Sequence, residues 1–87
     1  MKIELIISPN CPFCLEAEKV WRIAAANHDL EFSIVDITQP DGATLTQRLN
    51  LQTVPAILID GTLRAVGVQT PEEAISLLQH SLRESTT

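Results

Sequence analysis

The feature that most constrains this chain is a pair of cysteines, separated by two residues, between an apolar run and a helix-like run. Cys11 and Cys14 follow the apolar residues 3–7 and precede an amphipathic segment at residues 15–27. A thiol that caps a helix lies near unpaired backbone N–H groups and the positive end of the helix dipole, and both favour the reactive thiolate. Pro12 suits the first position of that helix. The sequence therefore predicts a catalytic redox pair, in which Cys11 attacks and Cys14, one turn later, reaches back to form the redox disulfide.

Length and composition limit the classes of protein to consider. The 87 residues are enough for one domain, so we expect a single domain over residues 1–87, with a frayed tail at residues 83–87. Hydrophobic residues make up 45% of the chain, which is typical of a globular protein. The net charge of −5 argues against nucleic acids and anionic membranes as partners, because both bind basic surfaces.

The location of the protein bears on what two cysteines can do. No apolar run approaches the roughly 20 residues that span a bilayer, and the N-terminal apolar run is short for a signal peptide. We therefore expect a cytoplasmic protein, and a monomer. A cytoplasmic dithiol is normally kept reduced, and a structural disulfide at this spacing would close only a very short loop, so a chemical role is favoured.

Apolar periodicity and turn signals predict seven elements. The strands are expected at residues 2–7, 31–37, 56–59 and 62–66, and the helices at residues 12–27, 43–49 and from 71 to about 82. Asp60-Gly61 is typical of a hairpin turn, and Thr70 with Glu73 can form a capping box. The order β-α-β-α-β-β-α predicts an α/β fold with a four-stranded mixed sheet and three helices.

Two motifs in this order of elements resemble a known family. Cys11-Pro12-Phe13-Cys14 and Thr53-Val54-Pro55 are similar to the active-site and cis-proline motifs of the thioredoxin-fold superfamily, in its minimal glutaredoxin-like form. The resemblance covers nearly the whole chain. It implies that Pro55 is cis and lies beside the cysteines, and that the backbone of Val54 pairs with an extended substrate. The residues that it implies for substrate binding are Pro12, Phe13, Thr53, Val54, Pro55 and Gly67.

The sequence also departs from the family patterns. Glutaredoxins carry a Gly-Gly-x-Asp signature that helps to hold glutathione, whereas residues 67–70 here read Gly-Val-Gln-Thr. A lysine often precedes their first cysteine, but residues 8–10 are Ser-Pro-Asn. Thioredoxins have a buried aspartate where Leu5 stands. The electron donor is therefore left open between glutathione and a thioredoxin-reductase-type protein.

The function that follows is dithiol–disulfide exchange with a disulfide-containing protein or small molecule, with no bound cofactor and no metal. The alternative is a carrier of copper or zinc, because soft thiolates bind both metals; an iron–sulfur cluster shared by two monomers is a lesser possibility. Pro12 and the Thr53-Val54-Pro55 motif argue against the metal carrier, which has no use for the second motif.

The remaining candidates have structural interpretations. Trp21 is expected in the core, and Asp36 at a turn. Phe13 is either exposed to a partner or buried, and Gly67 either leaves room for a peptide or only ends a strand. The residues expected at helix ends or on a solvated helix face are His28, His80, Glu16 and Glu18.

Overall fold

The computed structural model describes residues 1–85, and its elements follow the predicted order. The strands are β1 (Lys2–Ile7), β2 (Glu31–Asp36), β3 (Ala56–Ile59) and β4 (Thr62–Val66). The helices are α1 (Pro12–Asn27), α2 (Pro40–Leu49) and α3 (Pro71–Ser85). Within the described residues, no helix is long and apolar enough to cross a membrane.

The four strands form one mixed sheet in the order β2-β1-β3-β4. β1 is parallel to β2 and antiparallel to β3, while β3 and β4 form an antiparallel hairpin. Asp60 and Gly61 turn this hairpin with φ angles of 51° and 82°, so the Asp-Gly signal marks the turn as predicted. These findings confirm the predicted fold, a minimal thioredoxin fold.

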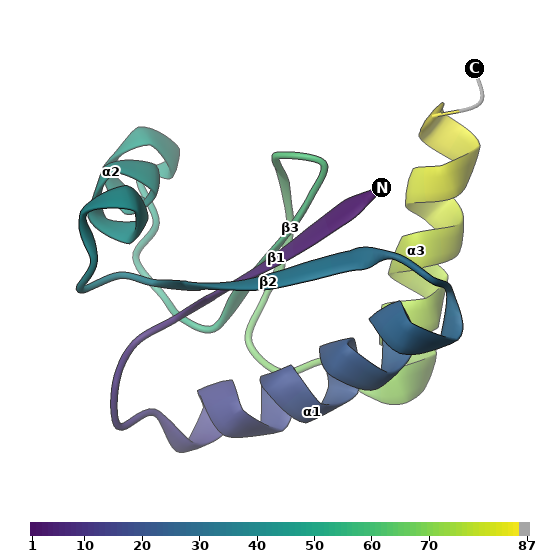
Figure 1. Ribbon diagram of the computed structural model, residues 1–87, viewed down its shortest axis with the longest axis horizontal. Helices are drawn as coiled ribbons and strands as arrows, with labels where there is room; N and C mark the ends of the chain where they lie inside the picture. Colours follow the sequence, from purple (N-terminus) through teal and green to yellow (C-terminus); the bar gives the residue numbers. More distant parts are fainter. Residues whose placement is uncertain (86–87) are drawn as a thin grey trace.

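Helices cover both faces of the sheet (Figure 1). Ile3 and Leu5 of β1 point to the face that carries α1 and α3, whereas Ile6 points to the face that carries α2. This alternation is the period of two that a strand requires. Trp21 of α1 is fully buried in the first core, as expected, together with Leu78 of α3.

The prediction for α2 was wrong at its start. The helix begins at Pro40 and not at residue 43, because Pro40 takes its first position and Gly42 lies within it. Gly42 is buried against the end of β2: a Cβ there would lie 2.6 Å from the carbonyl carbon of Asp36 and closer still to its oxygen. The glycine that looks like a helix breaker therefore allows α2 to approach the sheet.

Two other boundaries also differ from the prediction. β2 ends at Asp36, one residue early, because Asp36 already accepts the hydrogen bonds of the next turn. Residues 83–85 belong to α3, where a frayed tail was expected. The rest of that expected tail, residues 86–87, lies outside the described residues.

Candidate active site

Cys11 caps α1 with its sulfur, as the sequence predicts. Its backbone is extended, with φ −110° and ψ 104°, and Pro12 follows in the first turn. The Cys14 N–H donates a hydrogen bond to Cys11 Sγ at 3.2 Å and also approaches the Cys11 carbonyl oxygen at 3.1 Å. The sulfur thus lies at the N-terminus of α1, with a backbone N–H directed at it.

The two thiols have different environments. Both cysteines are free thiols in this structure; Cys11 is half-buried, whereas Cys14 is only 4% exposed. Burial, followed by the hydrogen bond with Cys11, raises the pKa of the Cys14 thiol from 9.0 to about 11. At neutral pH Cys14 therefore keeps its proton, and Cys11 is the sulfur that is accessible to an incoming disulfide.

The proline motif lies at the same end of the sheet as the cysteines. Ile6 of β1 pairs with Ala56 of β3, so the residues that precede β3 lie next to those that follow β1. The Val54–Pro55 bond is cis, as the resemblance implies. Pro55 is buried, Val54 is half-buried and Thr53 is exposed.

Gly67 contacts the proline motif through its backbone. It follows β4 with a φ of 82°, and its N–H donates a hydrogen bond to the Pro55 carbonyl oxygen at 2.7 Å. Apart from its two chain neighbours, no atom of residues 1–85 lies within 4 Å of a Cβ built at Gly67. Gly67 therefore ends the strand, and it also leaves open space beside the proline motif.

A hollow of about 470 Å³ lies beside the cysteines. Its walls are the end of β1, residues 8–10, the first turns of α1 with both cysteines, and Glu18. Phe13 is 65% exposed next to it, which decides between the two alternatives for this side chain in favour of exposure. Pro12 is exposed as well. Around Cys11 the surface thus combines apolar side chains with room for a substrate.

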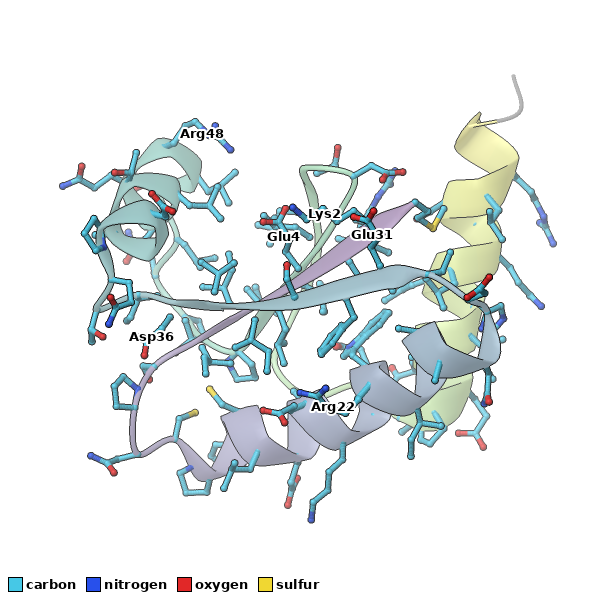
Figure 2. All side chains as sticks on the ribbon, viewed as in Figure 1. Lys2, Glu4, Arg22, Glu31, Asp36 and Arg48 are labelled. Atoms are coloured by element: carbon cyan, nitrogen blue, oxygen red, sulfur yellow. The ribbon has the colours of Figure 1, made fainter. Side chains whose placement is uncertain are left out.

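The charged residues near this end of the sheet have structural partners. Asp36, labelled in Figure 2 at the end of β2, accepts hydrogen bonds from the Thr38 N–H at 2.8 Å and the Thr38 hydroxyl at 2.7 Å, and these hold its pKa below the ordinary value. Glu18 forms an ion pair with Arg22 at 3.1 Å on α1. Asp36 is therefore a turn residue, as expected.

The two histidines lie away from the cysteines. His28 caps the C-terminus of α1, with Nδ1 2.8 Å from the Ala24 carbonyl oxygen. His80 lies within α3 and not at its end, so that detail of the prediction was wrong.

One buried polar residue was missed by the sequence reasoning. Gln69, 7% exposed, accepts a hydrogen bond from the Trp21 indole N–H at 2.9 Å and donates one to the Val66 carbonyl oxygen at 3.2 Å. These contacts tie the segment after β4 to α1. Trp21 and Gln69 are 48 positions apart, and no local pattern links them.

Comparisons with known proteins agree with this architecture. The family model for the thioredoxin domain matches residues 1–79. A thioredoxin of Methanocaldococcus jannaschii is 27% identical over 82 residues, which are 94% of this chain and 96% of that protein.

Solved structures show the same fold. Thioredoxin 1 of Thermosipho africanus has a TM-score of 0.76 at 21% identity, with both chains fully covered. A protein disulfide oxidoreductase of Aeropyrum pernix has a TM-score of 0.81 at 23% identity, over 95% of this chain and 38% of that one. The glutaredoxin-like NrdH-redoxin of Escherichia coli, described as having a thioredoxin-like activity profile, has a TM-score of 0.63 at 15% identity, over 88% and 95% of the two chains. Since the family model covers most of the sequence, this chain belongs to the thioredoxin domain family.

Proposed function

We propose that the protein is a thiol–disulfide oxidoreductase that reduces disulfides by dithiol exchange through Cys11 and Cys14. The observation that carries the proposal is the capping geometry: Cys11 Sγ accepts the Cys14 N–H at 3.2 Å, while the second thiol is buried directly behind it. One sulfur is accessible at the N-terminus of a helix, and the other is buried one turn away, where it can attack the first.

The reaction has two steps. The Cys11 thiolate attacks one sulfur of the substrate disulfide, so that a mixed disulfide forms and the other substrate sulfur leaves as a thiolate. Cys14 then loses its proton to solvent and attacks Cys11 Sγ, which releases the second substrate sulfur. Two electrons have passed to the substrate, which becomes a dithiol, and Cys11 and Cys14 are joined in a disulfide.

For the donor that reduces this disulfide, we propose a thioredoxin-reductase-type protein over glutathione. Residues 67–70 stand where glutaredoxins carry their Gly-Gly-x-Asp signature, and Thr70 stands in place of its aspartate. The Gln69 side chain is turned inward to Trp21, and the Thr70 hydroxyl accepts the Glu73 N–H at 3.1 Å. Both polar groups of the segment are therefore engaged within the protein. The thioredoxin-like activity profile named for the glutaredoxin-like NrdH-redoxin is consistent with such a combination.

The donor is tested with two coupled assays that follow NADPH consumption with the same disulfide substrate. One contains thioredoxin reductase, and the other contains glutathione with glutathione reductase. Turnover with thioredoxin reductase alone supports the proposal. Turnover with glutathione alone contradicts the proposed donor, and no turnover in either assay or with dithiothreitol contradicts the proposed activity.

Two features of the chain favour exchange over transport of copper or zinc. Pro12 lies in the first turn of α1 and stiffens the segment between the cysteines. The cis-proline motif Thr53-Val54-Pro55 has no role in a metal carrier. We also propose that the protein acts in the cytoplasm, where its dithiol is kept reduced; localisation of a tagged protein tests this.

A further inference from the structure

We propose that Gln69 is a positioning residue for extended polypeptide disulfides, because it fixes the edge beside the cis-proline relative to the helix that carries the cysteines. The inference rests on the proposed function and concerns how the protein holds a polypeptide substrate. It assigns a role to a residue outside the pair of cysteines.

The first part of the connection runs from α1 to Gln69. Trp21 is fully buried and lies about two helical turns after Cys14. Its indole N–H donates to Gln69 Oε1 at 2.9 Å. Because α1 is a continuous helix, this bond fixes the position of Gln69 relative to the cysteines.

The second part of the connection runs from Gln69 to the end of β4 and Pro55, which we call the substrate edge. Gln69 Nε2 donates to the Val66 carbonyl oxygen at 3.2 Å, at the end of β4. The next residue, Gly67, donates its N–H to the Pro55 carbonyl oxygen at 2.7 Å. Val66 also pairs with Ala56, directly after the proline. Gln69 therefore links α1 to the end of β4, which is hydrogen-bonded to Pro55 through Gly67.

Burial makes this link effective. Gln69 is 7% exposed and its bond with Trp21 is buried, so loss of that bond leaves a buried indole N–H without its partner. The segment after β4 is then expected to move to find new partners, and Gly67 moves with it. No regular helix or strand includes residues 67–69, and the Gln69 side chain anchors them through its bonds with Trp21 and Val66.

An extended polypeptide and a small disulfide depend differently on this edge. A polypeptide that pairs with the Val54 backbone must also run past Gly67, where the structure leaves open space. A small disulfide needs only Cys11. Displacement of the edge should therefore weaken the binding of a peptide and leave the chemical step unchanged.

The test is single-turnover reduction by the prereduced full-length protein, which requires no electron donor. Two substrates are compared over a range of concentrations: a linear peptide closed by one disulfide, and hydroxyethyl disulfide. For Gln69→Met, we expect the half-saturating concentration of the peptide to rise about tenfold, as for the loss of a buried hydrogen bond. The maximal rate, the rate with hydroxyethyl disulfide and the redox potential should stay as in the wild type.

Trp21→Phe breaks the same hydrogen bond from the other side, so the test stands if Gln69→Met does not fold. The double variant should be no worse than the poorer single variant, because both remove one connection. Gln79→Met makes the same chemical change on the exposed side of α3 and should have no effect. The chain contains one tryptophan, so the single indole N–H signal in an NMR spectrum should report the loss of the bond in Gln69→Met.

The outcomes separate the two proposals. A wild-type protein that reduces neither substrate overturns the proposed function. A wild type that reduces both, with variants that bind the peptide normally or that lose the two activities equally, overturns the positioning role of Gln69.

Discussion

Two helices of this protein begin alike and end up with different tasks. α1 and α3 each have a proline at the first position, preceded by a capping residue. In α3, Thr70 Oγ1 accepts the Glu73 N–H at 3.1 Å, and Glu73 Oε1 accepts the Thr70 N–H at 2.9 Å. In α1, Cys11 Sγ accepts the Cys14 N–H at 3.2 Å, and the first turn contains no acidic residue.

The difference separates stability from reactivity. The cap of α3 uses two oxygen acceptors, and two acidic residues in its first turn complement the helix dipole. The cap of α1 leaves that positive end to a sulfur, and no carboxylate in the first turn competes with it. The cap of α3 thus stabilises its helix, whereas the positive end of the α1 dipole faces the Cys11 sulfur alone.

The largest expected effect comes from giving α1 an oxygen cap. Cys11→Ser should abolish disulfide reduction, because the nucleophile is lost. It should also raise the free energy of unfolding by about 0.5 kcal/mol, because a serine hydroxyl is among the best N-cap acceptors. Insulin reduction and urea unfolding measure the two effects.

Cys14→Ser is the matched control for this experiment. It retains the attacking sulfur and should accumulate mixed disulfides that mass spectrometry detects. Full turnover by the Cys11→Ser protein would refute the assignment of the nucleophile.

The second effect is a pH dependence that belongs to Cys14 alone. Burial is the largest cause that raises the pKa of this thiol, to about 11, and burial persists in the mixed disulfide. Resolution of a preformed mixed disulfide should therefore accelerate about tenfold per pH unit between about pH 7 and pH 9, as the thiolate fraction grows. A flat profile in stopped-flow release measurements would show that Cys14 is not the titrating group.

The same shift has a consequence for stability. The pKa of Cys14 in the folded protein lies above the value of 9.0 for the ordinary thiol. The contribution of the protonated thiol to the free energy of unfolding is therefore fully present below about pH 9. It is lost as the pH rises towards about 11. The reduced wild type should lose stability in that window, and the Cys14→Ser protein should lose less.

The third effect tests whether a helix N-terminus alone makes a thiol reactive. In a Cys11→Ser, Cys14→Ser background, Thr70→Cys places a sulfur at the cap of α3. We expect it to react with iodoacetamide about tenfold more slowly than Cys11 does in the Cys14→Ser protein, because the Glu73 carboxylate disfavours a nearby thiolate. Adding Glu73→Gln to the Thr70→Cys protein should bring its rate of reaction with iodoacetamide closer to that of Cys11. Equal rates without that change would mean that the neighbouring charge is irrelevant.

Both caps could be predicted from the sequence because each depends on neighbouring residues only. Pro12 and Pro71 mark the first helical positions, and Thr70 and Glu73 are spaced as a capping box. The cis bond before Pro55 was also predicted, although from the resemblance and not from local chemistry.

The failures concern contacts between distant segments. The helix predicted at residues 43–49 left out Gly42, but in the structure this glycine lies in α2 where the helix packs on the end of β2. A sequence pattern does not show which backbone segments come close. Gln69 carried no signal, because its partner Trp21 lies on another element. The exposure of Phe13 was undecided for the same reason: the apolar period of a helix gives the face, and the tertiary packing decides what covers it.

The smallest expected effect comes from removing the oxygen cap of α3, and it concerns stability alone. Thr70→Ala removes the hydroxyl that accepts the Glu73 N–H, so the free energy of unfolding should fall by about 1 kcal/mol, with insulin reduction unchanged. Thr70→Ser should restore most of the loss, and Thr44→Ala, at an exposed position of α2, serves as the control. If Thr70→Ala slowed peptide reduction in proportion to the lost stability, the segment before α3 would contribute to binding, and the division of labour between the two caps would not hold.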